Sequence, residues 1–102
     1  MAHVITLPRE FFGRATARRL AAGINDTDIA LDAGSVLRHN TPALDELVKQ
    51  LLNADVERVV TVNASPTFQR ALQVIHRART RPERTFLLTF RDVPAEALLR
   101  AV

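Results

Sequence analysis

The residues of this chain that could carry out chemistry are few and lie far apart in the sequence. The three histidines, His3, His39 and His76, have no histidine partner at helical spacing and do not predict a metal site. Asp28 and Asp32 stand four residues apart in a β-prone stretch, which would place both carboxylates on one strand face for acid–base work. Carboxylates at such positions more often mark strand ends in solvent, so we do not take them as catalytic.

Two absences in the composition narrow the function further. The chain has no cysteine, which excludes disulfides, thiolate zinc sites and cysteine nucleophiles. Its three glycines, Gly13, Gly23 and Gly34, are isolated and form no phosphate-binding loop. The sequence therefore predicts a protein that is not an enzyme and that needs no cofactor or metal.

Basic residues gather in two places along the chain. All but one of the 14 basic residues are Arg, and they crowd at Arg14, Arg18, Arg19, Arg77, Arg79, Arg81 and Arg84. One interpretation is a binding surface for nucleic acid or another polyanion. The net charge is only +3, and the five aromatic residues are all Phe, so we favour a solvated Arg-rich surface and regard nucleic acid as an alternative.

A hydroxyl followed by proline occurs twice, at Thr41-Pro42 and Ser65-Pro66. Such a hydroxyl can cap the free N–H groups at the start of a helix, with proline in the first turn. A phosphate on Thr41 would instead add negative charge at a helix start and repel an acidic partner. Thr41 is thus a candidate either for a helix cap or for a phosphorylation switch.

Strand and helix signals alternate along the chain. β-prone stretches predict strands over residues 2–7, 28–33, 57–62 and 85–90. Apolar residues at helical spacing predict helices that begin near Gly13, Thr41 and Ser65, and a last helix over residues 94–102 with Leu98, Leu99 and Val102 facing inward.

This order predicts one α/β domain over residues 1–102, a βαβαβαβα chain with a mostly parallel four-stranded sheet flanked by helices. The length of 102 residues fits one domain. No apolar run is long enough to cross a bilayer, and the first residues do not resemble a signal peptide. We therefore expect a cytoplasmic protein with no membrane partner.

Three segments resemble the STAS domain of bacterial anti-sigma factor antagonists. Residues 31–36, Leu-Asp-Ala-Gly-Ser-Val, are similar to the family's strand ending in an aspartate. Residues 40–44, Asn-Thr-Pro-Ala-Leu, stand where the family commonly has Asp-Ser-Ser-Gly-Leu, and residues 62–66, Val-Asn-Ala-Ser-Pro, are similar to a later strand-to-helix turn. The resemblance covers nearly the whole chain, from about residue 4 to residue 102, and implies a regulatory module that acts through protein–protein interaction.

The second segment also departs from the family pattern. Pro42 occupies the position of the family's phosphorylated serine, so the usual switch is absent or moved to Thr41. The resemblance implies that the loop from Val36 to Asn40 and the following helix start dock a partner, with Arg38, His39, Asn40 and Thr41 in contact. It implies as partner an anti-sigma factor or an ATPase-fold serine kinase.

The first predicted strand, residues 2–7, carries apolar residues without lysine or an internal proline. Many STAS domains have a further strand before this one, which we do not expect here, so this strand would lie at a sheet edge open to pairing. We expect a homodimer formed by two such edges. The competing expectation is that Pro8, or the segment of residues 9–12 with Phe11 and Phe12, folds over the edge and leaves a monomer.

Overall fold

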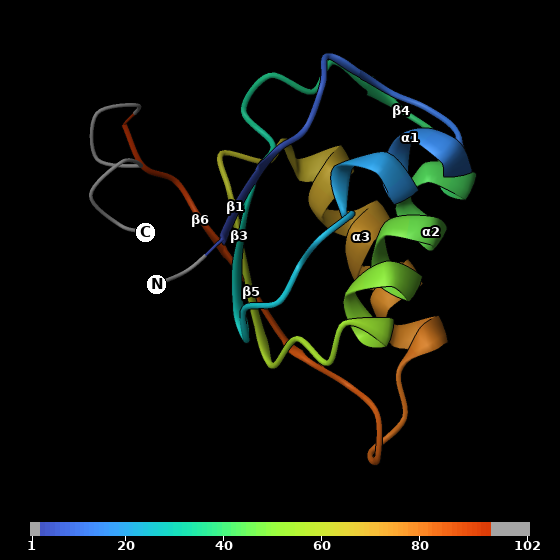
Figure 1. Ribbon diagram of the computed structural model, residues 1–102. Helices are drawn as coiled ribbons and strands as arrows, with labels where there is room; N and C mark the ends of the chain where they lie inside the picture. Colours follow the sequence, from blue (N-terminus) through green and yellow to red (C-terminus); the bar gives the residue numbers. More distant parts are fainter. Residues whose placement is uncertain (1–2, 95–102) are drawn as a thin grey trace.

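The computed structural model describes residues 3–94, in which strands alternate with helices (Figure 1). The strands are β1 (His3–Thr6), β2 (Glu10–Phe11), β3 (Asp28–Asp32), β4 (Arg38–His39), β5 (Arg58–Val62) and β6 (Leu87–Arg91). The helices are α1 (Arg14–Leu20), α2 (Thr41–Asn53) and α3 (Pro66–Arg79). Strands β1, β3, β5 and β6 form a parallel sheet in that order, and β2 pairs with β4 in a separate two-stranded ribbon.

The three helices all lie on one face of the four-stranded sheet (Figure 1). Its strands are neighbours in the order in which they occur in the chain. Crossovers between parallel strands are right-handed, so an unbroken progression across the sheet returns every helix to the same side. The expectation of a parallel α/β sheet is confirmed, and its helices form one layer in the described part of the chain.

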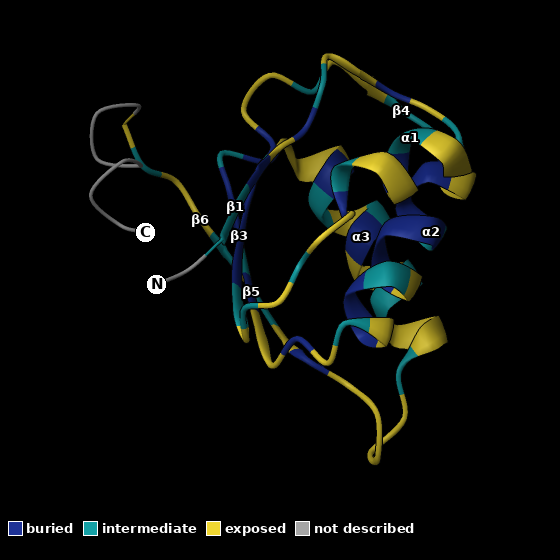
Figure 2. Cartoon of the chain, viewed as in Figure 1, coloured by how far each residue is buried: buried dark blue, intermediate teal, exposed yellow. Residues whose placement is uncertain are grey.

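The core lies between the sheet and α2, where buried residues are concentrated (Figure 2). From the sheet it receives Ile5, Ile29, Leu31 and Val59, and from the residue directly after β1 it receives Leu7. From α2 it receives the apolar stripe expected from the sequence: Leu44, Leu47, Val48, Leu51 and Leu52. These side chains recur every three or four residues, so one side of α2 faces the sheet along its whole length.

The second face of the sheet has a small apolar centre. Val4, Ala30 and Val60 lie side by side in register, and Ala30 is fully buried although it does not belong to the main core. An Arg58–Asp28 ion pair of 3.0 Å lies at one end of this face. Within residues 3–94 no helix covers it, which is uncommon for a parallel sheet.

The predicted and observed elements differ in detail. The ribbon of β2 and β4 was not predicted, α1 ends at Leu20, and the last strand begins at Leu87 instead of Thr85. The helix expected over residues 94–102 lies outside the described residues apart from Pro94. No helix within the described range has the length and apolar character needed to span a membrane.

Candidate functional site

The segment expected to dock a partner forms half of the β2–β4 ribbon. Glu10 lies opposite Arg38 and Phe11 lies opposite His39. The backbone N–H groups of Leu37 and Arg38 both donate to the carbonyl of Arg9, at 2.8 and 3.1 Å. These hydrogen bonds hold the segment directly before α2 in a two-stranded ribbon.

The inner side of the ribbon is anchored in the core. Phe11 is fully buried and belongs to the main apolar cluster. The His39 ring meets the ring of buried Phe68 on α3 edge to face, with centroids 5.2 Å apart and an interplanar angle of 86°. His39 therefore positions the ribbon against α3, and its ring is engaged within the fold.

Asn40 holds the ribbon, α1 and α2 together. Its side-chain oxygen accepts from the Ala43 N–H at 3.1 Å and from the Gly13 N–H at 3.2 Å. The first bond makes Asn40 the N-cap of α2, and the second ties that cap to the residue that begins α1. The interpretation of Thr41 as the cap is wrong: Thr41 is the first helical residue, because the side chain one position earlier already reaches the free N–H. Ser65 caps α3 as expected, accepting from the Phe68 N–H.

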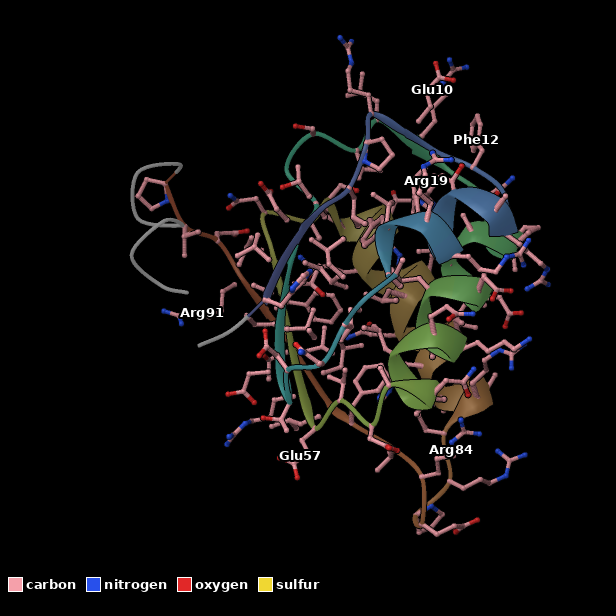
Figure 3. The ribbon with its side chains drawn as sticks, in the orientation of Figure 1. Glu10, Phe12, Arg19, Glu57, Arg84 and Arg91 are labelled. Atoms are coloured by element: carbon pink, nitrogen blue, oxygen red, sulfur yellow. The ribbon has the colours of Figure 1, made fainter. Side chains whose placement is uncertain are left out.

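The outer side of the ribbon is exposed and combines charge with apolar surface. Arg38 donates to Glu10 at 2.7 Å, and both side chains are more than half exposed. Leu37 is 67% exposed and Phe12 is 39% exposed. Figure 3 shows Glu10 and Phe12 pointing away from the body of the molecule at the tip of the ribbon. With exposed Thr41 at the start of α2, these residues form a surface that we call the ribbon surface: Glu10, Phe12, Leu37, Arg38 and Thr41.

A charged cluster on the first turns of α2 fixes the helices behind this surface. Asp45 accepts from Arg14 on α1 at 2.8 Å and from both Nε and Nη2 of Arg79 on α3, the latter at 2.7 Å. The Arg79 hydrogen bonds, assisted by Arg14, lower the pKa of Asp45 from 3.8 to about 2. One carboxylate thereby links all three helices.

The next residue, Glu46, is a buried carboxylate. It is 2% exposed, accepts from Gln50 at 2.6 Å and lies 3.5 Å from both Arg14 and Arg18. The Gln50 hydrogen bond lowers the pKa of Glu46 against the opposing effect of burial, with further help from nearby cations. Glu46 is therefore held in its charged form between α1 and α2.

These contacts assign structural partners to several members of the two Arg clusters. Arg14, Arg18 and Arg79 are paired with the carboxylates of α2, and Arg84 donates to Asn53. Arg81 donates to the carbonyls of Ala78 and Thr80. The carboxylates of α2 offset part of the positive charge that a polyanion-binding surface would present.

The isolated acids and histidines also have local roles. Asp28 pairs with Arg58, and Asp32 accepts from the Gly34 N–H at 3.0 Å, which closes the turn after β3. His76 contacts the Phe86 carbonyl. Within residues 3–94 no group of three or more His, Cys, Asp or Glu side chains is arranged to hold a metal ion.

The turn after β3 and the turn after β5 meet at the carboxyl edge of the sheet. A Cβ on Gly34 would come within 3.4 Å of the Asn63 Cβ and 3.3 Å of the Asp32 carboxylate. The turns after β3 and β5 are thus in close contact, and a larger side chain at Gly34 would have to displace one of them. Asn63 has a φ of 58°, a left-handed conformation that Asn tolerates better than most residues.

Comparison with known proteins finds no matching family model, no matching curated protein and no matching solved structure.

Proposed function

We propose that this chain is a regulatory protein-interaction module that docks its partner through the ribbon surface. The observation that carries the proposal is the pairing of a rigid, core-anchored ribbon with exposed apolar side chains. Leu37 and Phe12 are two of the four large hydrophobic residues exposed in the described part of the chain. Both lie beside the Arg38–Glu10 pair, and such a mixture of apolar and charged groups is typical of partner-binding surfaces.

The resemblance to STAS domains supports the same position, since residues 36–44 comprise β4, the residues on either side of it and the start of α2. On this basis we propose an anti-sigma factor or an ATPase-fold serine kinase as the partner, in the bacterial cytoplasm and without a catalytic role for the chain itself. Arg38 and Thr41 would contact the partner directly, because both are exposed. His39 and Asn40 would act by holding the ribbon and the helix start in place.

Thr41 is the residue through which such docking could be regulated. Its exposed hydroxyl is not used as the helix cap, so a kinase could modify it without removing the bond that starts α2. A phosphate there would place negative charge two residues beyond the end of β4 and three residues from Arg38 in the chain. A Thr41→Asp variant that folds normally and loses the partner would support the switch, whereas unchanged binding would remove it.

Site-specific photo-cross-linking tests the docking surface. A photoreactive amino acid is placed in the full chain at Leu37 or, as a matched control, at Val74, which is 60% exposed on α3. The expected result is one cross-linked protein from position 37 only, identified by mass spectrometry as an anti-sigma factor or ATPase-fold kinase. Equal cross-linking from both positions, or a product only from Val74, would overturn the proposal.

A further inference from the structure

A groove runs between α3 and β6, which is the edge strand at the opposite end of the sheet from β1. It has a volume of about 400 Å³ and is lined mainly by Gln73, His76 and Arg77 from α3 and by Phe86, Leu88 and Phe90 from the β6 segment. Leu88 and Phe90 are half-buried and pack against the main core. The groove therefore has an apolar floor with a polar and cationic wall.

The backbone of β6 presents hydrogen-bonding groups to this groove. The Leu87 N–H donates to the Glu57 carbonyl at 2.9 Å, and the Arg91 carbonyl accepts from the Asn63 N–H at 2.8 Å. Because alternate residues of a strand bond to opposite sides, Leu87, Thr89 and Arg91 face β5. The N–H and carbonyl groups of Leu88 and Phe90 then face outward, where β6 pairs with no strand in residues 3–94.

His76 closes one end of this free edge. Its Nε2 lies 2.8 Å from the Phe86 carbonyl, and its ring stacks edge to face on Phe86 with centroids 4.7 Å apart. The outward carbonyl of Phe86 is thus occupied, while the next two outward-facing residues, Leu88 and Phe90, are left for pairing. The backbone groups available and the apolar floor come from the same residues, Leu88 and Phe90.

The side chains and backbone groups of the groove indicate which kind of peptide segment it could bind. An extended segment added beside β6 would bond to the outward groups of Leu88 and Phe90, and its alternate side chains would enter the groove under α3. Arg77 on the wall is exposed, and among residues 3–94 no carboxylate lines the groove. A segment with apolar side chains and at least one carboxylate matches this surface.

We propose that the α3–β6 groove binds an extended, acidic segment of another protein as a fifth strand of the sheet. This site is separate from the ribbon surface and does not depend on it. Main-chain hydrogen bonds to Leu88 and Phe90 supply the pairing, and Arg77 selects acidic over basic segments. The chain would then hold two separate binding positions.

The test uses the full chain, labelled for NMR, and a short blocked peptide in which every second residue is valine or glutamate and the residues between are serine, so that valine and glutamate enter the groove from the same strand face. Amide exchange of Leu88 and Phe90 is expected to slow at least tenfold when the peptide is added. A peptide N-methylated at alternate amides is expected not to bind, because it keeps the side chains but cannot pair. A peptide with lysine in place of glutamate is expected to bind about fivefold more weakly.

Arg77→Glu is expected to reverse the preference between the glutamate and lysine peptides, while Arg19→Glu on exposed α1 surface leaves it unchanged. Equal binding of the N-methylated peptide, or no binding of any peptide, would overturn the proposal. Slow amide exchange of Leu88 and Phe90 in the chain without peptide would also overturn it. If that slow exchange does not depend on protein concentration, the groove is occupied by the chain's own residues 95–102. If it depends on concentration, the groove is occupied by a second copy of the chain.

Discussion

At the scale of single residues, the distinction between Asn40 and Thr41 decides how the candidate site is understood. The sequence places two polar side chains in succession before Pro42, and both residue types are good helix caps. Only the geometry shows that Asn40 accepts from the Ala43 N–H and also reaches the Gly13 N–H. The second contact spans 27 residues, so no local pattern in the sequence could reveal it.

We predict that Asn40→Ala lowers the free energy of unfolding by about 1 to 2 kcal/mol, because the variant leaves two backbone N–H groups without their acceptor. Thr41→Ala is the matched control and should change stability by less than about 0.5 kcal/mol. Urea unfolding of the two variants measures both values. A larger loss for Thr41→Ala than for Asn40→Ala would contradict the capping assignment.

Asp45 makes the stability of the helix layer depend on pH. Its pKa falls from 3.8 to about 2 in the folded chain, so the unfolded chain takes up a proton first as the pH decreases. The stabilisation is complete above the ordinary pKa and is lost as the pH falls from about 4 through 2. Arg14 and Arg79 are each more than a third exposed, so solvent screening limits the effect to about 1 kcal/mol.

The measurement is the free energy of unfolding of the chain and of Asp45→Asn between pH 5 and pH 2. The difference between the two proteins should shrink as the pH falls through this range. Glu83→Gln, at an exposed position outside the cluster, should follow the parent chain. A difference between parent and Asp45→Asn that stays constant with pH would show that the ion pairs do not set the acid stability.

At the scale of secondary-structure elements, the sequence predicted those with strong periodicity. The apolar stripe of α2 and the β-branched run of β5 identify their elements without ambiguity. The β2–β4 ribbon escaped because each of its strands has only two residues, too few for any period to appear. The sequence feature that could have indicated the ribbon is the pair Phe11-Phe12 after Pro8. Two adjacent aromatic residues on an extended segment point to opposite sides, so one can be buried while the other is exposed.

This alternation leads to a prediction for the ribbon. Phe11 is fully buried whereas Phe12 is 39% exposed. Phe11→Ala should lower the free energy of unfolding by about 3 to 5 kcal/mol through loss of core packing. Phe12→Ala should cost well under about 1 kcal/mol and leave the ribbon in place. Chemical denaturation of the two variants compares them directly, and similar losses would show that the ribbon is not anchored through Phe11.

At the scale of the whole molecule, parallel order and right-handed crossovers were predictable, whereas the placement of all described helices on one face was not. The second outcome depends on strand order, which alternating elements alone do not specify. The sheet has two edges, β1 and β6. Residues 9–12 do not cover β1, because Glu10 and Phe11 pair with β4 instead.

We therefore retain the prediction of a homodimer formed through the β1 edge, since the segment that competed for this edge is engaged elsewhere. At high concentration, light scattering should give a mass twice the 11.4 kDa of one chain. A proline in β1 should block the pairing of the two edges, but Ile5 is unsuitable for this substitution because it belongs to the core. Thr6→Pro, at an exposed edge position, is the better variant and should give a monomer. A constant mass near 11.4 kDa at all concentrations would contradict the dimer.

The central claim is that the ribbon surface docks a regulatory partner. The most direct test is calorimetric titration of purified variants of this chain with the partner protein that cross-linking identifies. Leu37→Ser combined with Arg38→Glu should raise the dissociation constant at least tenfold, because the double substitution removes exposed apolar area and breaks the ion pair with Glu10. Val74→Ser, at a similarly exposed position on α3, should leave the affinity unchanged. Equal affinity for the parent chain and the ribbon variant would contradict the account.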